Sequence, residues 1–329
     1  MNNQSKLANL KTKDKIEHFL LLTNFAVKTT KAGREFLDLE LRDESVSLNA
    51  KMWNNFQSFI NDAKSGSVVK VLGMMDEFNN VPQIKIEKIR STNEKDEITP
   101  EDFLPKSERP LAEMKDELEL YINSIQSKNL KQLIQNIFTE SNFNKYIKVP
   151  AGKAWHHAYI GGLLEHTLEI IKICDLMCRI HPDVNRDLLL TGAILHDFGK
   201  IEELDFSGGF DYTDKGKLLG HIVIIANIIE REANKIKGLT EEIKNQLIHL
   251  VLSHQGRLEY ASPVTPKTVE AIILYHADEL SAKTNAYKCA IAAEKDTGNI
   301  WTRYLPLAET SLFITGNAEK KDDFKETFF

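Results

Sequence analysis

Apolar residues alternate with other residues along positions 16–92, as they do in half-buried β-strands. In EFLDLELRD three leucines alternate with Phe, Asp and Glu, and VSLNAKMW repeats the two-residue period. The stretch NFQSFINDAKSG then shows helical spacing and ends on Gly66, after which SVVKVLGMMDEF and PQIKIEKI return to strand alternation around an Asn79–Asn80 turn. The pattern predicts three strands, a short helix and two further strands.

This order and length are typical of a five-stranded β-barrel of the oligonucleotide-binding (OB) type, a fold used for single strands. Residues 93–110 are charged and contain three prolines, which predicts a linker with little core of its own. From there to about residue 295 the apolar spacing is helical, and the charged ending NAEKKDDFKETFF predicts a loose tail. We expect a barrel domain at 1–92, a linker with connecting helices at 93–148, a helical domain at 149–300 and a partly flexible C-terminal segment at 301–329.

Composition and charge indicate an ordinary globular protein. Its 329 residues are 42% hydrophobic and 27% charged, enough for two domains with separate cores. A net charge of -6 gives no global basic signal, so nucleic acid would have to bind to a local patch. No stretch reaches the roughly 18 to 20 apolar residues of a membrane span, no secretory signal opens the chain, and three cysteines argue against a disulfide framework. We expect a cytoplasmic protein without membrane contacts.

Several histidines and aspartates interrupt the apolar stripes of the predicted helices. Ten histidines are present, and all but His18 lie between residues 156 and 276. A buried polar group without a partner costs roughly 1 to 3 kcal/mol. A shared cation removes that cost, and imidazole nitrogen together with carboxylate oxygen favours a divalent transition metal. The candidate ligands, at inward-facing positions or helix ends, are His166, His196, Asp197, His221, His254 and Asp278.

The neighbours His196 and Asp197 in GAILHDFGKI set a geometric condition. Adjacent side chains diverge by about 100° on a helix, so both can reach one ion only where the helix ends. Gly199 supplies that end. The last of the ligand-bearing helices is expected to begin with Thr265 as its cap and Pro266 as its first residue. The alternative is a set of separate capping or core histidines, which is the better interpretation for any one residue but not for six groups together.

These motifs resemble those of the HD-domain metal-dependent phosphohydrolases, a family named for an adjacent His-Asp pair. The resemblance covers roughly residues 150–290 and includes LLEHT, ILHDFGKI, LLGHIV, LSHQG and YHADEL. It implies an all-α HD-domain helical bundle, which together with the predicted five-stranded OB-type barrel before it gives a multidomain α and β fold. It assigns a first metal ion to His166, His196, Asp197 and Asp278, and a second ion to His221 and His254, with Asp197 as the bridging catalytic residue.

The order of a barrel, a helical connector and WHHAYIGGLLEHTLEI further resembles the YhaM family of 3′–5′ exoribonucleases. This resemblance implies a cytoplasmic enzyme that shortens single-stranded RNA, with some action on single-stranded DNA, and releases 5′-mononucleotides. It also implies two divalent ions, with Mn²⁺ expected first and Co²⁺, Fe²⁺ or Zn²⁺ as alternatives. Whether a homo-oligomer forms is left open.

Further residues near the motifs are candidates for catalysis. Lys200 is predicted to contact a phosphate, and its alternative is a solvated cation at the helix end. His157 is predicted to contact substrate or to donate a proton to the leaving 3′ oxygen. Lys153, Trp155 and His156 are expected to line the same entrance, although core packing explains Trp155 equally well.

The predicted barrel would hold the strand while its 3′ end reaches the metal ions. Stacking on an aromatic side chain is worth roughly 1 to 3 kcal/mol per base. Asp38 and Glu40 share a strand face with Phe36 and would repel phosphate. The candidate stacking residues are Trp53, Phe36 and Phe78, and the candidate phosphate partners are Arg34, Lys51 and Lys85.

Two alternative functions are compatible with the same residues. One is an HD phosphohydrolase of free or cyclic nucleotides, in which the barrel serves assembly. The other is a non-catalytic nucleic-acid-binding protein with a structural metal. The histidine pattern does not separate either alternative from the exoribonuclease.

Overall fold

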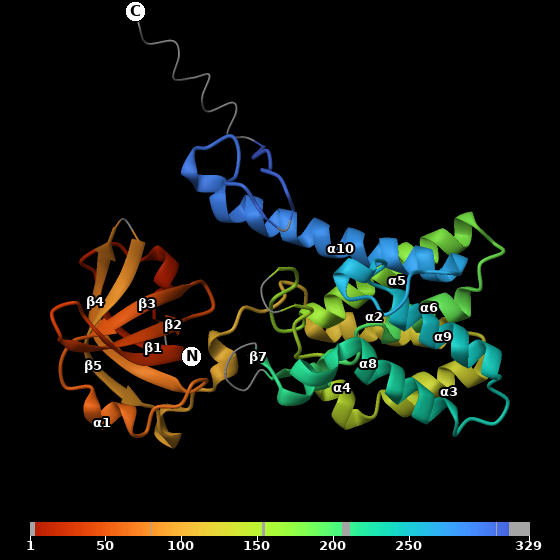
Figure 1. Ribbon diagram of the computed structural model, residues 1–329, viewed down its shortest axis with the longest axis horizontal. Coiled ribbons are helices and arrows are strands. Elements are labelled where there is room, and N and C mark those ends of the chain that lie inside the picture. Colours follow the sequence, from red (N-terminus) through yellow and green to blue (C-terminus); the bar gives the residue numbers. More distant parts are fainter. Residues whose placement is uncertain (1–3, 80, 153–154, 206–210, 307, 316–329) are drawn as a thin grey trace, which may run out of the picture. The chain divides into compact units, whose positions relative to one another are not determined.

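The computed structural model describes residues 4–79, 81–152, 155–205, 211–306 and 308–315 (Figure 1). Asn80, Lys153 and the end of the predicted tail from residue 316 therefore lie outside the described residues. The chain forms two compact units, and we describe each by itself. The first comprises Met1–Lys106 and Leu204–Asp214, and the second comprises Ser107–Glu203 and Lys215–Phe329.

The first unit contains a closed five-stranded barrel (Figure 1). Its elements are β1 (Lys15–Thr29), β2 (Glu35–Arg42), β3 (Ser47–Met52), α1 (Gln57–Ile60), β4 (Val68–Phe78) and β5 (Val81–Ser91). The strands are hydrogen-bonded in the order β1-β2-β3-β5-β4 and close through β4 and β1, with β3 and β5 parallel and the other pairs antiparallel. The predicted OB-type barrel is confirmed.

The alternation that predicted the strands fills the barrel core. Along β2 the leucines at 37, 39 and 41 are buried, whereas the residues between them are partly or fully exposed. Because side chains of a strand alternate between its two faces, a shift by one residue would turn the leucines into solvent. The strand register is therefore fixed by the same pattern that predicted it.

The predicted linker has more structure than its composition suggested. It contains two short 3₁₀ helices, η2 (Glu94–Asp96) and η3 (Pro100–Phe103), and the side chain of Asp102 accepts a hydrogen bond from the backbone of Thr99 (2.9 Å). This capped turn presents Phe103 and Leu104 to the interior, where both are buried. The expectation of a segment with little core is thus wrong at these two residues.

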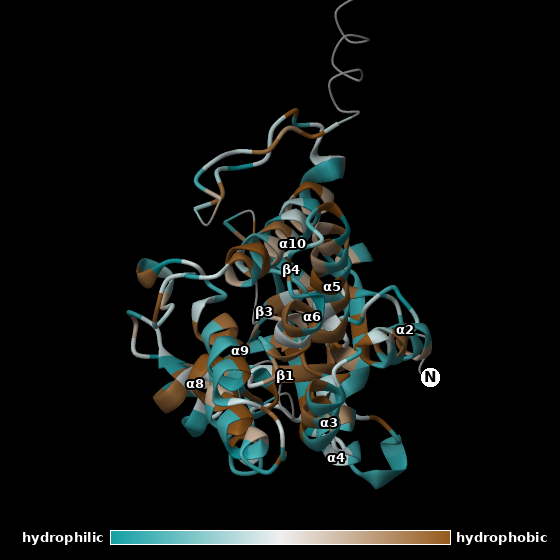
Figure 2. Cartoon of the chain, turned by 90° about the vertical axis from the view of Figure 1, so that its right-hand side faces the viewer, coloured by the Kyte–Doolittle hydropathy of each residue, from teal (hydrophilic) through white to brown (hydrophobic). Residues whose placement is uncertain are grey.

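The second unit is a helical bundle, as predicted. Its helices are α2 (Leu111–Ser124), α3 (Lys128–Ile137), α4 (Glu140–Tyr146), α5 (Gly162–Ile180), α6 (Arg186–Leu195), α7 (Lys200–Glu203), α8 (Asp214–Ala233), α9 (Glu241–Ser253) and α10 (Val269–Glu294). Helix α6 lies among α3, α5, α9 and α10, which surround it in Figure 2. Every residue from Leu188 to Lys200 is consequently buried.

Two details of the helical region differ from the sequence prediction. A hairpin of two-residue strands, β6 (Leu204–Asp205) and β7 (Asp211–Tyr212), follows α7. Helix α10 begins at Val269 rather than at Pro266, because Thr268 and not Thr265 is its cap: the Thr268 hydroxyl accepts a hydrogen bond from the Ala271 amide (3.1 Å). None of the helices in the described part of the chain has the length and apolarity needed to cross a membrane.

Candidate metal centre

Five helices bring the predicted ligands together in the second unit. His166 lies in the first half of α5, His221 follows a kink in α8, and Asp278 lies in α10. The remaining three follow helix ends: His196 and Asp197 come directly after α6, and His254 directly after α9.

The end of α6 meets the geometric condition set by the adjacent pair. The helix stops at Leu195, the next helix begins at Lys200, and the intervening residues let both side chains turn to one side. Gly199 packs against the backbone carbonyl of His221, so that a Cβ atom at this position would overlap with that oxygen. Glycine therefore permits the close approach of the two segments that carry Asp197 and His221.

A glycine also sets the direction of His221. Gly220 interrupts α8 with φ 71° and ψ 153°, a conformation that is open to glycine but strained for other residues. The kink leaves the His221 amide free of the helical ladder, and this amide donates to Glu203 Oε1 (2.9 Å). The same carboxylate oxygen lies 3.0 Å from the Nδ1 atom of His221.

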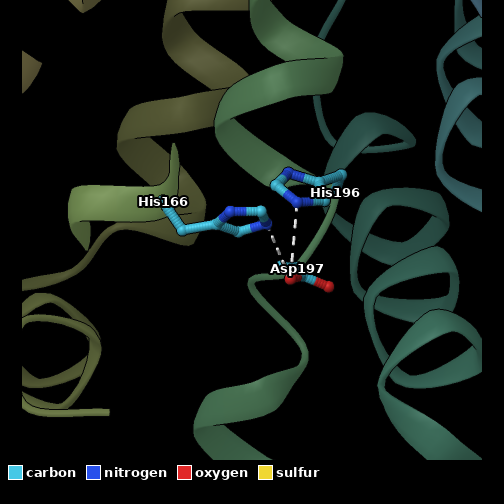
Figure 3. A group of neighbouring side chains, drawn as sticks. All are labelled: His166, His196 and Asp197. Atoms are coloured by element: carbon cyan, nitrogen blue, oxygen red, sulfur yellow. Dashed lines mark ion pairs between the residues drawn. The ribbon is translucent and has the colours of Figure 1, made fainter. Parts of the chain in front are cut away.

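The first group of ligands gathers around one oxygen of Asp197 (Figure 3). Asp197 Oδ2 lies 3.4 Å from His196 Nε2 and 3.9 Å from His166 Nε2. Asp278 Oδ1 lies 3.0 Å from the same nitrogen of His166. His166, His196 and Asp197 thus offer ligand atoms within 4.8 Å of one another, and Asp278 adjoins this group at His166.

The second group gathers around the other oxygen of the same carboxylate. Asp197 Oδ1 lies 3.2 Å from His221 Nε2 and 3.6 Å from His254 Nε2. The two oxygens of Asp197 thus face two different sets of histidines. This is the arrangement that a carboxylate bridging two cations requires.

The hydrogen bonds of the four histidines indicate which ring nitrogen is free. In a neutral imidazole, a ring nitrogen that bonds to a backbone carbonyl carries the hydrogen, which leaves the other nitrogen with a lone pair. His196 Nδ1 bonds to the Ala193 carbonyl (2.8 Å) and His254 Nδ1 to the Val251 carbonyl (2.7 Å). The Nδ1 atoms of His166 and His221 bond to side chains instead. In all four residues Nε2 is the nitrogen that points toward Asp197.

Unsatisfied polar atoms test whether these residues suit a metal. Among the described residues, the buried side-chain atoms without a hydrogen bond include His166 Nε2, His196 Nε2, His221 Nε2 and Asp197 Oδ1. Each unsatisfied atom of this kind costs roughly 1 to 3 kcal/mol, and a cation at the cluster would satisfy all of them. Imidazole nitrogens with carboxylate oxygens suit a divalent transition metal. The residues present therefore fit the metal ions implied by the sequence.

The protonation states of three ligands, Asp197, His166 and His254, suit metal binding. Burial by itself would raise the pKa of Asp197, but Lys200 and His196 outweigh burial and hold it well below the ordinary range. Burial lowers the pKa of His166 and lowers that of His254 to about 4. For His196, burial is outweighed by Asp197, which raises its pKa. At neutral pH the centre thus contains an ionised Asp197 and neutral His166 and His254.

Lys200 lies inside the cluster rather than in solvent. Its Nζ atom donates to Asp197 Oδ2 (2.5 Å) and to the Ala151 carbonyl, and the side chain is buried. The alternative of a solvated cation at the helix end is therefore wrong. Its contact with a phosphate stays a prediction.

The two consecutive histidines before α5 lie beside the cluster. The rings of His156 and His157 are 5.1 and 5.2 Å from the ring of His166. His157 has no exposed side-chain surface, and its Nε2 atom lies 3.5 Å from Glu169 Oε2. Burial lowers the pKa of His156 to about 3. Whether His157 donates a proton during catalysis stays a prediction.

Three residues behind the predicted ligands were not predicted from the sequence. Ser281 and Glu169 lie behind His166, and Glu203 lies behind His221. A spacing rule was available for two of them, because Glu169 comes three residues after His166 and Ser281 three after Asp278, close to one helical turn in each case. Nothing in the sequence indicated Glu203, whose contact depends on how the last residue of α7 meets the kink in α8.

The candidate nucleic-acid residues form one continuous patch on the barrel of the first unit. The rings of Phe36 and Trp53 stack with centroids 4.8 Å apart, and Arg34 lies 5.3 Å from the Trp53 ring. The Lys51 ammonium lies 5.9 Å from the ring of Phe36 and 4.9 Å from that of Phe78. Lys85 on β5 is paired with Lys51 on β3.

The expected repulsion from acidic residues is reduced at this patch. Asp38 forms a salt bridge with Lys28 (2.6 Å), which offsets its charge. The sequence did not indicate this pairing, because Lys28 lies on β1 and Asp38 on β2.

The chain is similar to known proteins over both of its predicted domains. The HD domain family matches residues 163–283, and the OB-fold nucleic acid binding domain family matches residues 25–92. The chain is 31% identical over 300 residues to the 3′-5′ exoribonuclease YhaM of Bacillus subtilis (strain 168), covering 91% of this chain and 95% of that protein. This chain belongs to the YhaM family. The HD-domain match contains all six predicted ligands.

A second relative and a solved structure are also similar to this chain. The 3′-5′ exoribonuclease YhaM of Geobacillus sp. (strain WCH70) is 32% identical over 300 residues, covering 91% of this chain and 92% of that protein. Among solved structures, the second OB-fold domain of replication protein A from Methanococcus maripaludis is 18% identical with a TM-score of 0.23, covering 27% of this chain and 94% of that one.

Proposed function

We propose that this protein is a metal-dependent 3′–5′ exoribonuclease that removes 5′-mononucleotides from single-stranded RNA. The observation that carries the proposal is Asp197, whose two carboxylate oxygens face two separate histidine groups in a chain of the YhaM family. The relatives named above are 3′-5′ exoribonucleases, and the chain spans nearly their whole length.

The proposed first ion is held by His166, His196, Asp197 and Asp278, and the second by Asp197, His221 and His254. His166 offers a neutral Nε2 atom to the first position and His254 offers one to the second, and the ionised Asp197 offers an oxygen to each. When bound, such ions lower the pKa of water and offset the negative charge of the phosphodiester.

The reaction adds water across the terminal phosphodiester. A bond forms between phosphorus and the water oxygen, the bond to the 3′ oxygen of the preceding nucleotide breaks, and that oxygen takes up a proton. We assign the proton to His157, which lies against the cluster and near the Glu169 carboxylate. We assign Lys200 to phosphate binding, because its ammonium already lies at the bridging carboxylate.

In our proposal the barrel holds the strand at the patch formed by Arg34, Phe36, Lys51, Trp53, Phe78 and Lys85. Stacking faces and cations alternate along it, which suits a single strand with exposed bases and phosphates. Because stacking tolerates every base, we expect little sequence preference from this patch.

Several finer features belong to the same proposal. Mn²⁺ is the expected ion, with Co²⁺, Fe²⁺ or Zn²⁺ as alternatives, and single-stranded DNA is a second expected substrate. We propose a cytoplasmic enzyme whose barrel domain spans 1–92, whose connector spans 93–148 and whose catalytic domain spans 149–300, with residues 301–329 as a C-terminal segment.

The proposal is tested with purified protein, Mn²⁺ and single-stranded RNA labelled at its 5′ end. We expect a ladder that shortens from the 3′ end, 5′-mononucleotides as products, and no reaction after chelation of the metal. Hydrolysis of free or cyclic nucleotides without any shortening of RNA would support the alternative phosphohydrolase. Binding of RNA without turnover, in a protein that unfolds on chelation, would support a structural metal.

A further inference from the structure

His166 differs from His196 and His254 in how its second ring nitrogen is held. His196 and His254 use a backbone carbonyl of their own helical turn, which their helices provide in any case. His166 Nδ1 instead lies 2.9 Å from the hydroxyl oxygen of Ser281, a residue of another helix. The orientation of His166 therefore depends on a side chain 115 residues away.

The hydrogen bonds behind His166 have a defined direction. The Ser281 hydroxyl donates to Glu169 Oε2 (2.6 Å), so its oxygen is left to accept the hydrogen of His166 Nδ1. With the hydrogen on Nδ1, the lone pair of His166 is on Nε2, the atom that faces Asp197 and Asp278.

The environment makes this chain of hydrogen bonds difficult to replace with water. Ser281 is 3% exposed and His166 has no exposed surface. Glu169 is the outermost member, with a side chain that is 40% exposed. Burial by itself would raise the pKa of Glu169, but the nearby His157 and the hydrogen bond from Ser281 outweigh burial and lower it. The terminal acceptor is therefore a carboxylate at neutral pH.

We propose that Ser281 and Glu169 are positioning residues for the first metal ion. They hold His166 in the tautomer and ring orientation that present Nε2 to the ion, and neither residue touches the ion itself. Partners that orient a metal-bound histidine typically change metal affinity by roughly 10- to 100-fold when removed. The inference rests on the metal centre of the proposed function and assigns to it two residues outside the HD motifs.

The test measures Mn²⁺ binding to the full-length protein in the absence of RNA, by the electron paramagnetic resonance signal of free Mn²⁺. For Ser281→Ala we expect one of two binding steps to weaken by about 10- to 100-fold, with the other step unchanged. Ser281→Thr keeps a hydroxyl and should restore most of the affinity. Glu169→Gln keeps an acceptor without its charge and should weaken the same step by a smaller factor.

Thr302→Val provides the matched control. Thr302 is 4% exposed, and its hydroxyl bonds to backbone groups of Arg303 and Leu312, outside the metal centre. Removal of this equally buried hydroxyl should leave both Mn²⁺ binding steps unchanged. A loss of affinity in this variant would assign the effect to general loosening of the fold and overturn the inference.

A second measurement separates positioning from a direct role with RNA. The RNA-degrading activity of Ser281→Ala should return toward that of the wild type as the Mn²⁺ concentration is raised, with an unchanged KM for RNA. Unaltered Mn²⁺ affinity in Ser281→Ala would overturn the inference and leave the exoribonuclease proposal intact. Two Mn²⁺ steps without RNA degradation by the wild type would overturn the exoribonuclease alone, and a wild type that binds no divalent ion would overturn both.

Discussion

Asp197 is the residue on which both predicted metal positions depend. Its oxygens face different histidine pairs, and the residue is only 3% exposed. Its ionised state is maintained by the neighbouring cations and imidazoles, chiefly Lys200. A buried carboxylate without compensating charges would destabilise the fold. The ionised state of Asp197 therefore depends on the groups around it.

The first prediction concerns replacement of this carboxylate. Asp197→Asn keeps the size of the side chain but removes the charge and one of the two acceptor oxygens. We expect RNA hydrolysis to fall by at least about 10³-fold, because residues that act as a unit in catalysis lose most of the rate together. Activity with labelled RNA and the number of bound Mn²⁺ ions are measured in parallel. Asp183→Asn, at an exposed carboxylate, should change neither quantity.

The second prediction concerns the aromatic patch of the barrel. Removal of the indole in Trp53→Ala should weaken RNA binding by about 1 to 3 kcal/mol, or roughly 5- to 150-fold in Kd. Since Phe36 stacks on Trp53, the double replacement should cost less than the sum of the two single ones. Fluorescence anisotropy of a labelled oligonucleotide without divalent ions measures both effects.

The control for this patch is Trp301→Ala, which removes another exposed indole outside the barrel. It should leave the Kd unchanged. Equal losses from Trp53→Ala and Trp301→Ala would mean that RNA contacts the surface without preference for the patch.

At the scale of single elements, most of the proposed metal ligands are positioned by the ends or kinks of helices rather than by their regular middle turns. The segment after α6 must place Asp197 within reach of His221 in α8, and the glycines at 199 and 220 make this possible for different reasons. Gly220 supplies a positive φ, whereas Gly199 supplies the space for a neighbouring carbonyl.

The third prediction follows from the close contact at Gly199. In Gly199→Ala the added methyl overlaps with the His221 carbonyl, and since both partners are backbone, one segment has to move. We expect a loss of stability of about 1 to 3 kcal/mol and weaker binding of the second Mn²⁺ ion, with the first less affected. Thermal unfolding and the Mn²⁺ binding curve check the two parts. Unchanged binding with normal stability would show that the contact is not required.

Elements with a regular burial pattern were predictable from the sequence. Elements whose position depends on which of several residues caps a turn were not. Strand β2 alternates because one face fills the barrel, and the same alternation is visible in its letters. The start of α10 was misplaced because Thr265 and Thr268 are both good caps, and only the folded chain selects the second. The burial of Phe103 was not predicted, because the charged and proline-rich composition of residues 93–110 gives no sign of a single capped turn within them.

At the scale of the whole molecule, the site assembles groups that are far apart in the sequence. Inward-facing histidines could be recognised one helix at a time, since each interrupts an apolar stripe. The hydrogen bonds behind them could not, because Glu169 and Ser281 lie 112 residues apart and meet only when α5 packs against α10. Sequence alone therefore predicted the proposed ligands but not the residues that hold them.

The fourth prediction concerns electrostatics of the full chain, whose net charge of -6 disfavours contact with nucleic acid in general. Binding of single strands should therefore depend on the local cations of the barrel patch. Each phosphate contact contributes about -0.7 to the slope of log K against log salt for single strands. Lys85→Gln should reduce the steepness of that slope by about this amount, since its exposed ammonium is free to meet a phosphate.

Lys237→Gln removes an exposed lysine of the helical unit and provides the control for charge alone. If overall charge governed binding, Lys85→Gln and Lys237→Gln would lower the affinity equally and would show the same slope of log K against log salt. If the patch governs binding, only Lys85→Gln changes the slope, and the loss of affinity is the same for oligonucleotides of different sequence, because phosphates carry no sequence information. The salt series thus distinguishes a dedicated strand-binding surface from general attraction.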